Sequence, residues 1–195
     1  MFGFFKKKPE LEMTDIIWKN DTAKQNGILK HISTNEKFIL LYYFQDTKEK
    51  IAETLHHANI TYAEHAGSSE KIVFVQADHL SITYSIHERT ICFLEHHPSA
   101  AVEKPVLDNL LESGIKKVLF FNSFNEPLFR YFGADRILSI LEKLGLEEDQ
   151  PIEHAMISQS IKNAQQKIDE KVSFPSNTKN SKDWISINLG NINPE

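Results

Sequence analysis

Short apolar runs alternate along the chain with segments whose apolar residues recur at helical spacing. Four continuous apolar runs are typical of strands covered on both faces of a parallel sheet: Lys37–Phe44, Lys71–Gln76, Thr90–Leu94 and Lys117–Asn122. Two weaker candidates are Ile60–Tyr62 and Leu80–Ile86, the second with the strict alternation of an edge strand. Helices are predicted between the strands at Asp21–Ile32, Thr47–Ala58 and Glu103–Ser113. The alternation predicts an α/β sheet with helices on both faces.

After the last predicted strand the apolar spacing becomes helical. Helices are predicted at Glu126–Phe132, Ala134–Leu144 and Ile152–Val172, and the composition turns polar and asparagine-rich from Ser173 onward. Four parts are therefore expected. They are a partly flexible N-terminal segment (1–20), an α/β domain (21–132), a helical extension (133–172) and a flexible polar tail (173–195).

Composition narrows the class of protein. The net charge is −5, and only three of the 22 basic residues are arginines, which disfavours nucleic-acid binding. A single cysteine, Cys92, lies in an apolar run, so we expect a buried free thiol. No window approaches the roughly 18 apolar residues of a membrane span, which predicts a soluble, cytoplasmic protein. Phe2, Phe4 and Phe5 before Lys6–Lys8 offer a peripheral membrane contact as an alternative to a disordered terminus.

Motifs for chemistry are sparse. The seven glycines are scattered, and no glycine-rich phosphate loop or Gly-x-Ser-x-Gly elbow occurs. Glu95, His96 and His97 follow a predicted strand at the end where α/β sheets usually place their sites. They form the best cluster for a hidden hydrolytic or metal-dependent activity, although solvated loop residues explain them more simply. No catalytic residue, metal ligand or cofactor is predicted.

The segment from Asn125 to Lys171 carries an ordered series of short motifs. PLFRYFG (127–133) and Asp135-Arg136-Ile137 come first, and Leu144-Gly145, PIEH (151–154) and NAQQKI (163–168) follow. In order and spacing, this series resembles the junction between the second nucleotide-binding domain of SecA preprotein translocase ATPases and their helical scaffold. The preceding region, 35–123, is similar to the motor domain itself. The resemblance implies a RecA-like fold of the helicase C-terminal type, a mostly parallel sheet with flanking helices followed by a small C-terminal helical extension.

Departures from the family concern the groups that handle phosphate. The family has a glycine- and arginine-rich loop that senses nucleotide, and later arginines that stabilise the transferred phosphoryl group. Here Ala77-Asp78-His79-Leu80 occupies the first place and the segment 110–117 the second, without arginine. Losing an arginine finger lowers the rate about a thousandfold or more. The resemblance thus implies a degenerate motor domain that does not hydrolyse ATP by itself.

Two sets of residues in the junction are candidates for contacts. Arg130, Arg136, Glu153 and His154 are predicted to anchor its turns. Ile157, Ile161, Ala164 and Ile168 recur at i, i+4, i+7 and i+11, a stripe that either packs on this domain or contacts a partner.

Three functions follow from these observations. The first is a non-catalytic, SecA-like interaction module, accessory to protein translocation or to a motor ATPase, with a translocase component or motor ATPase as its protein partner. The second is a nucleotide-binding domain that completes an ATPase site in trans. The third is a divergent hydrolase or metal site near Glu95, His96 and His97.

Overall fold

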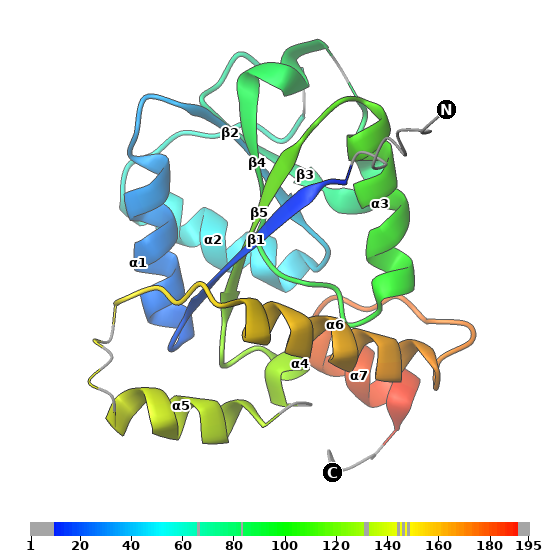
Figure 1. The fold of residues 1–195 in the computed structure, drawn as a ribbon. Coiled ribbons are helices and arrows are strands. Elements are labelled where there is room, and N and C mark those ends of the chain that lie inside the picture. The colour runs from blue at the N-terminus through cyan, green and yellow to red at the C-terminus, as the bar shows by residue number, and fades with distance from the viewer. Residues whose placement is uncertain are drawn as a thin grey trace, which may run out of the picture.

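A five-stranded, all-parallel sheet forms the centre of the protein (Figure 1). The computed structural model describes residues 10–65, 67–82, 84–130, 133–143, 145, 147 and 149–190. For residues 84–85, 135–136 and 141–142 it describes only the backbone. The strand order is β1-β5-β4-β2-β3. The strands are β1 (Glu12–Trp18), β2 (Lys37–Tyr42), β3 (Ile72–Gln76), β4 (Arg89–Phe93) and β5 (Lys117–Ser123). The α/β fold class is confirmed, and the parallel sheet is consistent with a RecA-like domain.

Helices cover both faces of the sheet, as the alternating pattern predicts (Figure 1). On one face, α1 (Asp21–Ile32) and α2 (Gln45–His57) bury Ile28, Ile51 and Leu55 against the strands. On the other, α3 (Ala100–Glu112) contributes Val106 and Leu110 to a second core. Cys92 lies in the first core without solvent exposure, so the prediction of a buried free thiol is confirmed.

The contact between α1 and β1 is unusually close. Gly27 of α1 lies against the indole of Trp18, and a Cβ at this position would lie 2.2 Å from Cε2 of that ring. Any side chain would therefore displace the tryptophan. Glycine here is required by packing between helix and strand.

After the sheet, the described residues form four helices: α4 (Pro127–Arg130), α5 (Ala134–Lys143), α6 (Ala155–Asp169) and α7 (Ser181–Leu189). Residues of α4, α6 and α7 pack together beyond the carboxyl ends of the strands, in a third core that includes Ile17 and Phe44. In Figure 1 these helices lie beneath the sheet. A short antiparallel pairing of Ile17 with Ile152 joins the segment before α6 to the edge of β1, with N···O distances of 3.0 and 2.8 Å.

The elements differ from the predicted ones in four places. Strand β1 lies in the segment where none was predicted, and it forms one edge of the sheet. The predicted strands Ile60–Tyr62 and Leu80–Ile86 are wrong. The first is irregular, and a single bridge follows it at Ala63. In the second, residues 80–82 are irregular and residues 84–86 belong to the 3-10 turn Tyr84–Glu88. Helix α7 forms in the segment expected to be a flexible tail, because Trp184 is 1% exposed against α4 and α6.

Candidate functional site

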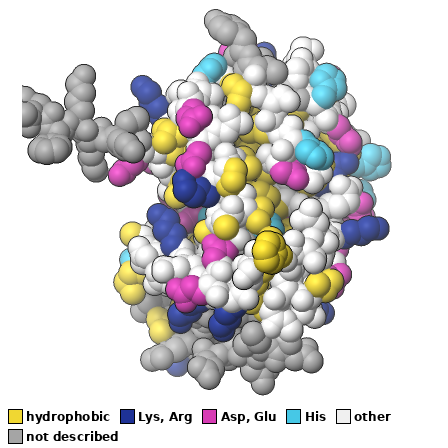
Figure 2. Space-filling view, turned by 90° about the vertical axis from the view of Figure 1, so that its right-hand side faces the viewer, with side chains coloured by type: hydrophobic (Ala, Val, Ile, Leu, Met, Phe, Trp, Pro, Cys, Tyr) yellow, Lys and Arg dark blue, Asp and Glu magenta, His cyan; other side chains and the backbone are white. Residues whose placement is uncertain are grey.

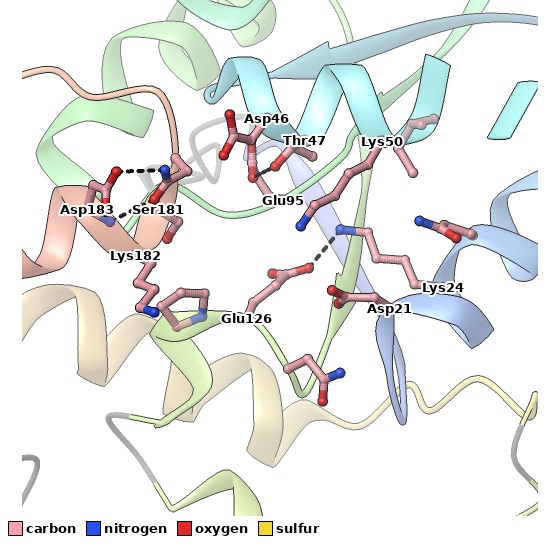
Figure 3. A pocket seen from close by; sticks show the side chains of 15 residues that line it. Asp21, Lys24, Asp46, Thr47, Lys50, Glu95, Glu126, Ser181, Lys182 and Asp183 are labelled. Carbon is pink, nitrogen blue, oxygen red and sulfur yellow. Dashed lines mark hydrogen bonds and ion pairs between the residues drawn. The ribbon is translucent and has the colours of Figure 1, made fainter. Parts of the chain in front are cut away.

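A cavity of about 480 Å³ lies at the carboxyl edge of the sheet, beyond β2, β4 and β5 (Figure 3). We call it the edge cavity. The first turns of α1, α2 and α7 and the start of α4 face it. Its charged lining residues are Asp21, Lys24, Asp46, Lys50, Glu95, Glu126, Lys182 and Asp183. Parallel sheets bring loops together at this edge, which is where α/β proteins usually bind ligands.

Lys24 of α1 is the buried cation of this site. Its Nζ donates to Oε1 of Glu126 at 2.7 Å and to the carbonyl of Leu94. The lysine side chain is 7% exposed and the glutamate side chain 16%. Glu126 also accepts the backbone N–H of Ser123 at 2.9 Å, while burial raises its pKa. The lysine charge is therefore already paired inside the protein.

Glu95 follows β4, and its side chain forms hydrogen bonds at the start of α2. Its carboxylate accepts the backbone N–H groups of Tyr43 at 3.1 Å and Phe44 at 2.9 Å, and the hydroxyl of Thr47. Such bonds satisfy donors that a helix N-terminus leaves without partners. Burial raises the pKa of Glu95 to about 7, against the opposing effect of Lys24. Glu95 thus has a structural role in tying β4 to α2.

The balance of charge in the edge cavity is acidic. Five carboxylates and three lysines line it, and in Figure 3 the amines of Lys24 and Lys50 point toward its centre. Among the described residues that line it, none is glycine or arginine. The lining therefore lacks the close backbone approach and the guanidinium groups with which proteins usually hold polyphosphates.

A second hollow, about 700 Å³ in volume, lies between β1, α3 and α6, and we call it the β1 groove. At its inner end His96 is held between two carboxylates. Its Nε2 lies 2.8 Å from Oδ1 of Asp15, and its Nδ1 lies 3.0 Å from Oε1 of Glu103. The ring also stacks on Phe120, with centroids 4.0 Å apart. All three polar side chains are buried.

The electrostatics of this trio favour a charged histidine. Burial alone would lower the pKa of His96, but the Glu103 charge and the hydrogen bonds with Asp15 and Glu103 raise it to about 10. Burial likewise opposes ionisation of Asp15, yet the bond and charge of His96 bring its pKa below the ordinary value. Both ring nitrogens are occupied by carboxylates, so His96 is not placed to serve as a general base.

The hypothesis of a hydrolytic or metal site near residues 95–97 requires three side chains to converge. Instead, Glu95 faces the edge cavity and His96 faces the β1 groove. His97 lies between Phe44 and Trp184, with ring centroids 5.4 and 4.9 Å away, and burial lowers its pKa to about 4. Within the part of the chain that the structure describes, no group of histidine, cysteine and acidic residues could hold a metal ion. The arrangement gives this hypothesis no geometric support.

The apolar stripe of α6 is buried within the chain. Ile157, Ile161, Ala164 and Ile168 are between 1% and 6% exposed, and all belong to the third core. Of the two alternatives left open by the sequence, packing on this domain is the one that the structure shows. Of the four, Ile161 also lines a hollow described above, the β1 groove, whereas a partner could contact Ile157, Ala164 and Ile168 only after α6 had moved away from the third core.

The predicted junction anchors lie on separate elements, in α4, in α5 and at the start of α6. Arg130 at the end of α4 and Glu153 before α6 are exposed, and only the backbone of Arg136 is described. His154 caps α6, because its Nδ1 accepts the N–H of Met156 at 3.2 Å. Phe2, Phe4, Phe5 and Lys6–Lys8 lie outside the described residues. None of the described helices has the length and apolar content needed to cross a membrane.

The two places where the family carries its arginines lie apart. Ala77–His79 forms a 3-10 turn directly after β3, with Asp78 and His79 exposed. The segment 110–117 runs from the end of α3 to the start of β5, at the opposite edge of the sheet from the edge cavity. Neither contributes a side chain to that cavity.

Sequence reasoning missed four charged residues of the two hollows: Asp15, Lys24 and Glu103, which are buried, and Glu126, which is half-buried. One of them had a local signal: Asp15 stands directly before the apolar run Ile16-Ile17-Trp18, where a charged residue is unusual. Lys24 lies 70 residues from Leu94 and 102 from Glu126 in the sequence, and Asp15 lies 81 residues from His96. Spacing along the chain could therefore not reveal these pairs.

SecA translocase subunits are similar in sequence to this chain. A SecA protein translocase subunit of Desulfotalea psychrophila is 29% identical over 185 residues, which covers 81% of this chain and 22% of the relative. SecA of Pelodictyon phaeoclathratiforme is 25% identical over 82% of the chain and 18% of its own length. SecA 1 of Alkaliphilus metalliredigens is 54% identical over 50 residues, 26% of the chain. No protein-family model matches.

These matches extend beyond the short motifs of the junction. The chain spans about a fifth of the length of the two relatives that cover most of it. Because these two matches cover most of the chain, the chain is homologous to SecA over most of its length and contains a SecA-related domain.

Proposed function

We propose that the chain is a non-catalytic, SecA-like interaction module that serves protein translocation by binding another protein, a motor ATPase or translocase component. The observation that carries the proposal is the acidic, internally paired edge cavity. The relatives named protein translocase subunits connect the chain to this process. A cytoplasmic location, with peripheral membrane contact through Phe2, Phe4, Phe5 and Lys6–Lys8, belongs to the same proposal.

The acidic residues of the edge cavity argue against ATP hydrolysis by this chain. A nucleotide triphosphate entering the edge cavity would meet Asp21, Asp46 and Asp183 at the helix starts, where the phosphates would need backbone N–H groups. Glu95 already accepts the N–H groups that lead into α2, and Glu126 already pairs with Lys24. Binding polyphosphate through these groups would break the Lys24–Glu126 ion pair and the hydrogen bonds of Glu95, at about 1–3 kcal/mol for each buried group left without a partner.

The test has two parts. Calorimetry with Mg·ATP and Mg·ADP should show no binding heat from the chain alone, and phosphate release should equal that of buffer. A full-length SecA should co-elute with the chain in size-exclusion chromatography. ATP hydrolysis by the isolated chain would overturn the non-catalytic assignment, whereas failure to bind SecA would remove the partner class.

A second function has one observation in its favour. Three lysines reach the edge cavity, and the amine of Lys50 points into it from α2 (Figure 3). Together with a phosphate loop on another chain, these amines would complete a nucleotide site in trans. The discriminating variant is Lys50→Gln, with Lys30→Gln on the exposed end of α1 as control. If the chain changes ATP turnover by SecA and Lys50→Gln alone abolishes that change, the in-trans site is the better account.

A further inference from the structure

The outer edge of β1 offers backbone groups for another strand. Even-numbered residues of β1 bond to β5, as the N–H of Glu12 does to the carbonyl of Lys116 at 2.9 Å. Odd-numbered residues face outward, because N–H and C=O of successive strand residues alternate in direction. Ile17 uses its outward pair to bond Ile152.

Beyond Ile17 no described strand pairs with that edge. The chain leaves the edge after Ile152 and enters α6, which His154 caps. Among the described residues, none forms a backbone hydrogen bond with the outward groups of Met13 and Asp15. Four backbone groups, two N–H and two C=O, therefore face the β1 groove, and Met13 and Asp15 both line it.

Apolar side chains form the floor beside these groups. Leu11 and Met13 of the β1 region, Leu107 and Leu111 of α3, and Ile161 of α6 line the groove. Leu11, Met13, Leu107 and Leu111 are only partly buried, so the groove leaves them in contact with water. Figure 2 looks onto the side that carries α3 and shows apolar side chains among charged ones on that face. A strand lying along β1 would place every second side chain on this floor.

The charged side chains that line the groove are mainly acidic. Five carboxylates line it, Glu10, Asp15, Glu103, Asp108 and Asp169, against two lysines and His96. One of the lysines, Lys104, is already paired with Asp108 at 2.5 Å. A basic occupant complements this acidic excess, and an acidic one is repelled.

We infer that the β1 groove binds an extended segment of a protein partner, which adds as a strand to the edge of β1 and carries apolar residues at alternate positions with at least one lysine or arginine. This inference rests on the proposed role as an interaction module and names the surface and the peptide chemistry of that role. The chain's own residues 1–9 and a second copy of β1 are the competing occupants.

Hydrogen exchange on the full chain separates these occupants. In the free protein, the amide of Met13, which is only partly buried, should exchange much faster than those of Thr14 and Ile16, which bond to β5. Slow exchange of Met13 at every concentration would mean that the chain covers its own edge. Protection that appears only as concentration rises would assign the edge to a second copy. Either result overturns the inference.

The positive test uses a phage library of random decapeptides selected on the full-length chain. Selected peptides should alternate apolar with other residues, include lysine or arginine, and slow exchange at Met13. Met13→Pro removes one outward N–H without touching the β5 ladder, since proline is tolerated on edge strands, and should weaken binding about tenfold. Leu107→Lys should weaken it through the floor, in case the proline variant does not fold.

Met156→Lys is the matched control, because Met156 is 72% exposed on α6 and does not line the groove. It should leave peptide binding unchanged. No enrichment of peptides, or equal binding by folded Leu107→Lys and Met156→Lys, refutes the inference. If full-length SecA still binds the chain in that event, the proposed function stands and only the docking site is wrong.

Discussion

His96 is predicted to contribute more to stability than any exposed residue, through its two buried carboxylate partners. Replacing it with asparagine leaves Asp15 and Glu103 without the imidazolium that lies 2.8 and 3.0 Å from them. Breaking a buried charge set by removing one member costs about 3–5 kcal/mol. The pKa of about 10, against an ordinary 6.5, corresponds to at most about 5 kcal/mol of linked stability. Both routes predict a loss of several kcal/mol.

The pH dependence gives this prediction a signature. The folded-state pKa of His96 lies above its unfolded value, so its contribution is complete below about pH 6.5 and disappears as the pH rises toward about 10. Over that interval the wild-type free energy of unfolding should fall with a slope of up to about 1.4 kcal/mol per pH unit. His96→Asn should lack this component, so the difference between the two proteins should shrink as the solution becomes alkaline.

Urea titration followed by tryptophan fluorescence measures both quantities, since Trp18 and Trp184 are buried in different cores. His56→Gln is the control, because His56 is exposed on α2 and should be within about 0.5 kcal/mol of wild type. A cost below about 1 kcal/mol for His96→Asn, or an unchanged alkaline slope, would refute the reasoning about the trio.

Three further predictions concern other buried contacts. The raised pKa of Glu95 makes the folded protein retain a proton that the unfolded chain releases, so the free energy of unfolding should decline between about pH 4.5 and about pH 7. Glu95→Gln should remove this decline. Urea titrations of both proteins across that range measure the difference. Gly27→Ala should cost about 1–3 kcal/mol by pressing on Trp18, whereas Gly67→Ala meets open space and should not lower the thermal midpoint. Trp184→Ala should cost about 3–5 kcal/mol and release α7, seen as rapid amide exchange over Ser181–Leu189 with α1 unaffected.

The core of the fold was predictable because parallel strands buried on both faces are continuously apolar. This pattern located β2, β3, β4 and β5 to within two residues at either end. It failed at β1, where Asp15 interrupts the apolar run and one edge of the strand lacks a neighbouring strand. Leu80–Ile86 alternates like a strand, but its apolar side chains Leu80 and Ile86 pack into the second core from irregular chain and a 3-10 turn.

The candidate site was less predictable, because buried charges depend on partners far apart in the sequence. Glu95 and His96 stood out as neighbours after a strand, yet successive residues there face different hollows. Lys24 and Glu126 gave no local signal, since each reads as an ordinary surface residue until the fold places them 2.7 Å apart. The stripe on α6 was recognised, but sequence alone could not tell whether this chain or another covers it.

The order of the strands has a consequence for how the chain is made. Of the described strands, β1 is synthesised first, and the one described strand that pairs with it is β5, more than a hundred residues later. Such distant pairing slows folding, because the loop must close before the contact forms. Until β5 is synthesised, Ile16, Ile17 and Trp18 have no strand beside them, so nascent chains that stop before Lys117 should be the form that chaperones and proteases recognise.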